Sequence, residues 1–130
     1  MNDNHAFEVV QGEGYAVGHL DAMGEGYGFR KIRRELGADA LGINALVLPP
    51  RYEAPAHYHE RQEEVYFVHR GEVEIKLGDD TRHLLGPGAL ARVDPTTVRQ
   101  LRNTGDEEAV LVIVGAADGY VGRDGRRPEG

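Results

Sequence analysis

The clearest pattern of apolar and polar positions lies between Glu72 and Leu77, where every second side chain is apolar and the intervening ones are charged. Successive side chains of a β-strand point to opposite faces. This alternation therefore predicts a strand with one buried face and one face toward solvent. Gly71 precedes the stretch and Gly78 follows it, which indicates a turn at each end.

Short apolar stretches separated by glycine, proline, asparagine and aspartate predict strands along most of the chain. The predicted strands are Tyr15–Leu20, Leu41–Leu48, Glu64–Arg70, Glu72–Leu77, Thr81–Leu85, Ala89–Val93, Val98–Arg102 and Val110–Val114. The last is continuously apolar, which favours a strand buried on both faces. Phe29, Ile32 and Leu36 lie at helical spacing before Gly37, so that segment is either a short helix or an irregular strand.

Short strands joined by tight turns, with almost no helix, indicate an antiparallel barrel or sandwich, because a parallel sheet needs long crossover connections. The chain has 130 residues, of which 40% are hydrophobic, and this suits one domain with a real core. We expect a single domain over residues 1–130, with its core at about residues 41–115. The first fourteen residues are expected to be loosely held, and the chain after Gly115 to be a surface tail.

Composition excludes several classes of function. The chain has no cysteine, so it forms no disulfide, thiolate metal site or thiol nucleophile, and it has no serine for serine-hydrolase chemistry. The formal net charge of −7 disfavours nucleic-acid binding, which draws on cationic contacts to phosphate. Neither a membrane-length apolar run nor a signal-peptide pattern is present, so we expect a cytoplasmic protein without nucleic-acid or membrane partners.

The stretch that carries candidate chemistry contains His57, Tyr58, His59 and Glu64. In a strand, residues two apart point to one face, so His57 and His59 project together while Tyr58 points away. Imidazole is the commonest metal ligand, and Glu64 opens the next predicted strand after a short bend. Two histidines and one carboxylate suit non-haem iron and also accept manganese, nickel or zinc.

These residues resemble the first conserved motif of the cupin superfamily: glycine, five residues, His-x-His, three or four residues, glutamate, six residues and glycine. The matching positions are His57, His59, Glu64 and Gly71. The opening glycine is replaced by Arg51, and the resemblance runs from about Leu41 to Gly115. It implies an all-β double-stranded β-helix, or jelly-roll barrel, whose ligands point into the barrel mouth. It also implies a homodimer built through edge strands.

The second cupin motif reads glycine, five residues, Pro-x-Gly, two residues, histidine, three residues and asparagine. Gly88 and Asn103 keep their places, whereas Asp94 and Thr96 replace the proline and the glycine. Arg99 stands where the fourth ligand, a histidine, would be. A guanidinium stays protonated and is no metal ligand, so the four-residue site of the family cannot form.

Two outcomes follow from Arg99. In the first, His57, His59 and Glu64 hold a divalent metal (Fe, Mn, Ni or Zn) with water in the other positions, and Arg99 clamps a small anionic substrate. In the second, Arg99 pairs with Glu64, and the pocket is a metal-free site that binds or senses a small ligand. Whether the protein is an enzyme stays open at this point.

The remaining polar residues have plainer interpretations. Tyr66 shares the inner face with Glu64, where it either lines the pocket or fills the core. His69 is expected to point outward, and His83 to be exposed in a polar hairpin. Two clusters of basic residues are interpreted as solvated surface, with local anion binding as the alternative. The clusters are Arg30, Lys31, Arg33 and Arg34, and Arg123, Arg126 and Arg127.

Overall fold

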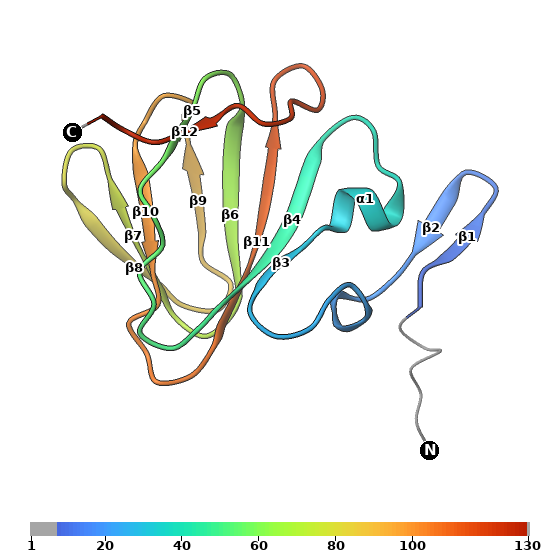
Figure 1. Ribbon diagram of the computed structural model, residues 1–130, viewed down its shortest axis with the longest axis horizontal. Coiled ribbons are helices and arrows are strands. Elements are labelled where there is room, and N and C mark those ends of the chain that lie inside the picture. The colour runs from blue at the N-terminus through green and yellow to red at the C-terminus, as the bar shows by residue number, and fades with distance from the viewer. Residues whose placement is uncertain (1–7, 130) are drawn as a thin grey trace.

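Two antiparallel β-sheets form the body of the molecule in the computed structural model, which describes residues 8–129 (Figure 1). The five-stranded sheet has the order β3 (Gly28–Arg30), β4 (Gly42–Leu48), β11 (Ala109–Ala116), β6 (Glu63–Arg70) and β9 (Leu90–Val93). The three-stranded sheet has the order β10 (Arg99–Arg102), β7 (Val73–Leu77) and β8 (Arg82–Leu85). This is the all-β double-stranded β-helix expected from the sequence.

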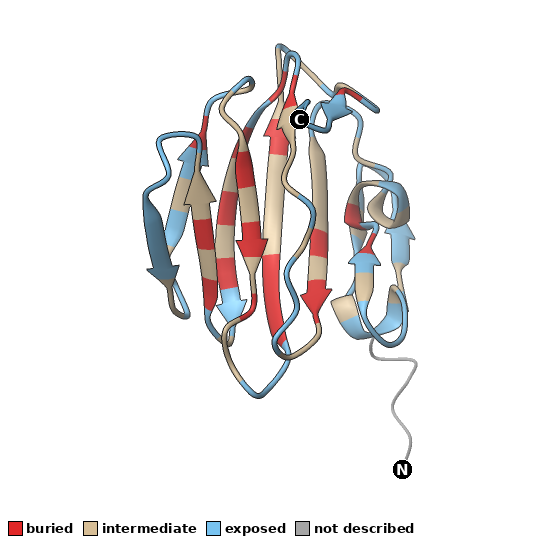
Figure 2. Cartoon of the chain, turned by 60° about the vertical axis from the view of Figure 1, so that its left-hand side comes forward, coloured by how far each residue is buried: buried red, intermediate tan, exposed pale blue. Residues whose placement is uncertain are grey.

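The hydrophobic core lies between these two sheets (Figure 2). Its fully buried members come from both sheets, and they include Leu48, Val68, Ile75, Leu101 and Leu111. Strand β11 is hydrogen-bonded to β4 on one side and to β6 on the other. Its residues are buried or half-buried along the whole strand, so neither face is open to solvent, which agrees with its continuous apolar run.

The backbone of two turns explains why glycine occurs at one glycine position of the first motif and why arginine can stand at the other. Gly71 has a φ of 80°, and a Cβ added there would lie 2.9 Å from the Cα of Ala109, so glycine fits this turn. Arg51, at the position of the missing glycine, also has a left-handed backbone, with a φ of 61°. Its Nε donates to Asp106 at 2.9 Å, which compensates part of the cost of that conformation.

The segment before β4 differs in part from the sequence expectation. Helix α1 is a single turn over Ile32–Leu36, and it ends at Gly37, whose φ is 72°. Phe29 belongs to β3 instead of the helix. The interpretation of Arg30 as solvated surface is wrong, because this side chain is buried and donates to the carbonyl of Gly26 at 2.7 Å.

Both ends of the described chain carry structure that the sequence did not indicate. Strand β1 (Val10–Gly12) pairs with β2 (Tyr15–Val17), so this part of the first fourteen residues is a hairpin, and residues 1–7 lie outside the description. A turn of 3₁₀ helix, η2 (Leu20–Ala22), follows. Strand β12 (Gly125–Arg126) pairs with β5 (Tyr58–His59), and the two cross one end of the barrel together (Figure 1).

The interpretation of the chain after Gly115 as a surface tail fits most of the described residues, which are exposed or half-exposed, but it does not fit Asp124. Strand β11 continues to Ala116, and Asp124 is only 6% exposed. A buried carboxylate needs partners, and the partners of Asp124 lie in the candidate site. No helix within residues 8–129 is long and apolar enough to cross a bilayer.

Candidate metal centre

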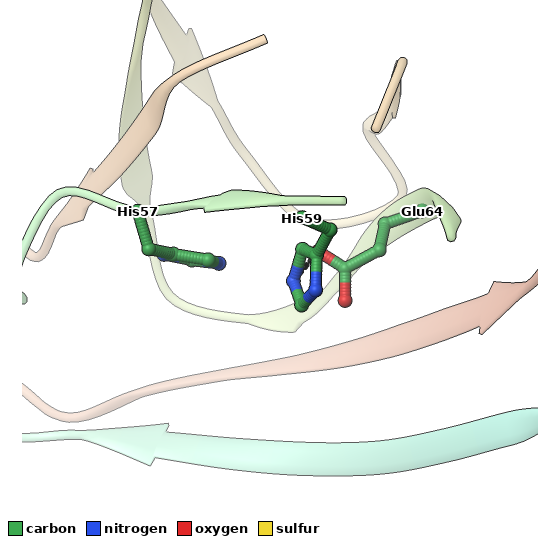
Figure 3. Close-up of side chains that lie close together, drawn as sticks. All are labelled: His57, His59 and Glu64. Carbon is green, nitrogen blue, oxygen red and sulfur yellow. Dashed lines mark ion pairs between the residues drawn. The ribbon is translucent and has the colours of Figure 1, made fainter. Parts of the chain in front are cut away.

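His57, His59 and Glu64 converge on one point inside the barrel (Figure 3). His59 lies in β5, His57 just before it, and Glu64 at the start of β6. One ligand atom from each residue lies within 4.8 Å of the other two. The structure thus brings together the three residues that the sequence predicts as ligands, close enough to hold one metal ion.

The backbone around His57 is fixed by a neighbouring strand. The N–H of His57 donates to the carbonyl of Arg99 at 2.9 Å, and the N–H of Arg99 donates back to the carbonyl of His57 at 2.8 Å. Both histidine rings then point into the same space, with centroids 5.1 Å apart in an edge-to-face arrangement. His57 and His59 thus lie on the same face, as alternation along a strand requires.

Asp124 orients His59, and sequence reasoning missed it. Its Oδ1 lies 2.8 Å from His59 Nδ1, while its Oδ2 accepts from the backbone N–H groups of Arg61 at 2.9 Å and Gln62 at 3.0 Å. Burial alone would raise the pKa of Asp124, but these hydrogen bonds outweigh it and hold the pKa well below the ordinary value. Asp124 is therefore an ionised acceptor for Nδ1–H.

This contact leaves Nε2 of His59 facing Glu64, at 3.2 Å from its Oε1. Metal-bound histidines in proteins almost always donate their second ring nitrogen to a carboxylate or carbonyl, which fixes the tautomer. Asp124 supplies that feature for His59. The donor set and the orienting carboxylate together fit a bound divalent cation.

Gln62 completes the support around His59. Its Nε2 donates to Asp124 Oδ1, and the side chain runs over Gly115. A Cβ at Gly115 would overlap Gln62 Oε1, so the absence of a side chain there makes room for this amide.

Glu64 is only 8% exposed, and three groups meet its Oε1. The hydroxyl of Tyr66 donates at 2.6 Å, His59 Nε2 lies at 3.2 Å, and Arg99 Nη2 lies at 3.8 Å. Burial works to raise the pKa of Glu64, but the hydrogen bonds of His59 and Tyr66 and the nearby positive charges lower it overall. Glu64 is thus kept as a carboxylate.

Arg99 is fully buried, with 0% exposure. Its guanidinium donates to the backbone carbonyls of Pro95 at 3.1 Å and Asp94 at 3.3 Å, so its hydrogen bonds go to the chain rather than to Glu64. The expected closeness of Arg99 and Glu64 is observed at 3.8 Å. Arg99 is not among the residues that line the cavity.

The two histidines have opposite pKa shifts. Burial and then the positive charge of Arg99 lower the pKa of His57, which favours the neutral ring that ligates metals. Burial also works to lower the pKa of His59, but its hydrogen bonds to Glu64 and Asp124 raise it overall. Of the two rings, His59 therefore has the greater tendency to take up a proton, and it lies between two carboxylates.

A cavity of about 480 Å³ opens onto these residues. Its polar end is formed by His57, His59, Glu64 and Tyr66, and much of the remaining lining is apolar and comes from both sheets. Arg123 and Arg127 also line it. Tyr66 thus reaches the cavity as well as the core. His69 and His83 are exposed, as expected, and take no part.

Comparisons with known proteins agree with the fold. The family model of the cupin domain matches residues 45–115. Protein SchB from Streptomyces halstedii is 36% identical over 77 residues, which cover 59% of this chain and 55% of that protein. The chain therefore spans little more than half of the length of this curated relative.

Two solved structures show the same architecture. A double-stranded beta-helix domain protein from Klebsiella pneumoniae superposes with a TM-score of 0.61 at 23% identity, over 70% of this chain and 76% of that one. The DMSP lyase DddQ from Ruegeria pomeroyi DSS-3 superposes with a TM-score of 0.62 at 25% identity, over 72% of this chain and 46% of that one. Since the family model covers more than half of the residues, this chain belongs to the cupin domain family.

Proposed function

We propose that this chain is a metal-dependent enzyme that acts on a small anionic molecule, with His57, His59 and Glu64 as the metal ligands. The observation that carries the proposal is the bond from His59 to Asp124, because it turns Nε2 toward Glu64 and the cavity. Two imidazoles and one carboxylate suit Fe, Mn, Ni or Zn. A bound divalent cation would supply Lewis-acid polarisation of a substrate oxygen at the polar end of the cavity.

Residues of this chain set the protonation and the charge at the polar end of the cavity. Burial and the charge of Glu64 raise the pKa of Tyr66 well above its ordinary value, so its hydroxyl stays protonated and holds Glu64 Oε1. Arg99 offsets part of the negative charge of Glu64 without occupying the cavity. With a divalent cation bound and His59 neutral, the cluster carries a net positive charge, which favours an anionic substrate.

The comparisons support an enzymatic role without naming the reaction. One protein with this architecture, and 25% identity to this chain, is a DMSP lyase. Folds of this kind host unrelated activities, so the substrate of that protein does not transfer to this one.

A second candidate function, metal-free binding of a small ligand, has one observation in its favour. Arg99 lies within ion-pair distance of Glu64 in a fully buried position, and a protonated His59 adds a second positive group at the same oxygen. Together they can neutralise Glu64 without a metal.

Metal analysis of protein purified without an affinity tag separates the two candidates. We expect about one equivalent of metal in the native chain after exposure to Fe, Mn, Ni or Zn, and almost none in His59→Ala. His83→Ala is the matched control, because His83 is exposed and lies outside the cluster. A native chain that stays well below one equivalent under all four metals, or a His59→Ala variant with unchanged metal content, would contradict the metal-dependent function.

A further inference from the structure

The C-terminal strap, which we define as residues 120–127, crosses the open end of the barrel beside β5 (Figure 1). It is held at its start and near its middle. The ring of Tyr120 lies 3.9 Å from the guanidinium carbon of Arg33, and Asp124 is bonded to His59 and to two backbone N–H groups. The strap is therefore a fixed part of the cavity wall.

The register of β12 decides which arginines of the strap face the cavity. Gly125 pairs with His59, and a Cβ on Gly125 would lie 3.4 Å from His59 Cε1, so Gly125 faces the histidines. Alternation within β12 then turns Arg126 outward, where its Nε pairs with Glu60 at 2.9 Å. Arg127 lines the cavity, and so does Arg123.

Arg123 and Arg127 carry positive charges that the described part of the chain does not neutralise. Within residues 8–129, no carboxylate lies in ion-pair distance of either side chain, whereas the outward Arg126 has Glu60. Two guanidinium groups at a cavity mouth attract anions and match a carboxylate or a similar oxyanion in geometry. All three arginines of this cluster are exposed, as expected from the sequence, but only Arg123 and Arg127 also line the cavity.

Much of the remaining lining of the cavity is apolar. It contains Leu46, Leu48, Leu101 and Ile113, together with the rings of Phe29 and Tyr52. The volume of about 480 Å³ falls in the range of roughly 300–1,000 Å³ that holds drug-sized molecules, so a two-carbon acid would leave most of it unfilled.

We propose that Arg123 and Arg127 are the anion-recognition residues of this cavity, and that its ligand is an amphipathic organic anion. The anionic group binds the two guanidinium groups of the strap, and the apolar body packs against the leucine and aromatic wall. The proposal rests on the proposed function in taking this cavity as the substrate site. It adds the class of substrate and the residues that select it.

Three probes test the proposal by isothermal titration calorimetry: 2-naphthoate, its neutral amide 2-naphthamide, and acetate. We expect the native chain to bind naphthoate about tenfold more tightly than naphthamide, since charge-assisted hydrogen bonds contribute on that order. Acetate should bind far more weakly than naphthoate, because it has no apolar body. The Arg123→Gln/Arg127→Gln variant should lose the preference for naphthoate while it keeps naphthamide binding.

Arg126→Gln is the control, because it removes one positive charge from the outer face of the same strap, and it should retain the preference. An undiminished preference in the double variant would overturn the role of the strap. Equal affinity for acetate and naphthoate, or no naphthoate binding by the native chain, would overturn the ligand class. Metal content is measured on the same samples, so that failure of the proposed function can be told apart from failure of this proposal. A native chain without metal would contradict the proposed function, whatever the naphthoate result.

Both substituted arginines are exposed, so we expect the double variant to fold. A thermal melt of each protein checks this expectation. If the double variant melts early, the single variant Arg127→Gln gives the same comparison and must lose part of the preference for naphthoate.

Discussion

The motif segment from His57 to Gly71 and the C-terminal strap build the same site in different ways. The motif segment supplies its groups through local geometry, namely strand alternation and one short bend between β5 and β6. The strap supplies Asp124 through a contact with His59 that spans 65 positions of the chain. The difference suggests a division of roles: the motif segment provides the ligands, and the strap sets their orientation and the charge of the cavity mouth.

Removing a ligand from the motif segment should have the largest effect. We expect His57→Ala to lower metal affinity at least about 100-fold, because one of only three protein ligands is lost. His69→Ala is the control, since His69 is an exposed histidine of the neighbouring strand β6. Equilibrium dialysis against the metal measures both. Equal affinities in the two variants would remove His57 from the ligand set.

Substitution in the strap should weaken metal binding without abolishing it. We expect Asp124→Asn to lower metal affinity about 10- to 100-fold, because the amide is a poorer acceptor for the Nδ1–H of His59. Asp106→Asn is the control, since Asp106 pairs with Arg51 on the surface. Full retention of affinity in Asp124→Asn would show that the strap does not orient the site.

The same substitution should reveal a pH-dependent stability. Asp124 has a lowered pKa in the folded chain, so its contribution is present above its unfolded pKa of about 3.9 and is lost as the pH falls through the folded value. We expect Asp124→Asn to reduce the free energy of unfolding by about 1–3 kcal/mol at neutral pH, and by less in acid. Urea unfolding at several pH values measures this difference. A difference that is constant with pH would contradict an ionised Asp124.

The smallest effect should come from the contact that holds the start of the strap. The guanidinium of Arg33 stacks on the ring of Tyr120, and both side chains are partly open to solvent. We expect Arg33→Ala to cost about 0.5–1 kcal/mol of stability, with Arg34→Ala as the neighbouring control. A loss in the control as large as in Arg33→Ala would mean that the stacking adds nothing.

The motif segment and the strap also differ in how much of their structure could be predicted from the sequence. The fold and the convergence of His57, His59 and Glu64 follow from alternation, turn residues and the motif register. The closeness of Arg99 to Glu64 follows from the second motif, but the bonds of Arg99 to backbone carbonyls do not, because they depend on the path of the turn before β10. Tyr66 was placed correctly on the inner face of β6.

Asp124 could not be predicted in the same way. It lies in a segment rich in glycine and arginine, without apolar alternation, and β12 is only two residues long. Nothing near it in the sequence indicates which strand it will pair with. A lone aspartate between Arg123 and Gly125 is the only local signal, and such a residue is usually found in a turn.

The most direct test of the account is a crystal structure of the chain loaded with metal, with diffraction data collected at the absorption edge of that metal. We expect an anomalous peak between His57, His59 and Glu64, with Asp124 still bonded to Nδ1 of His59. A metal-loaded crystal with no peak at these three residues, and with Glu64 held only by Tyr66, His59 and Arg99, would contradict the central claim.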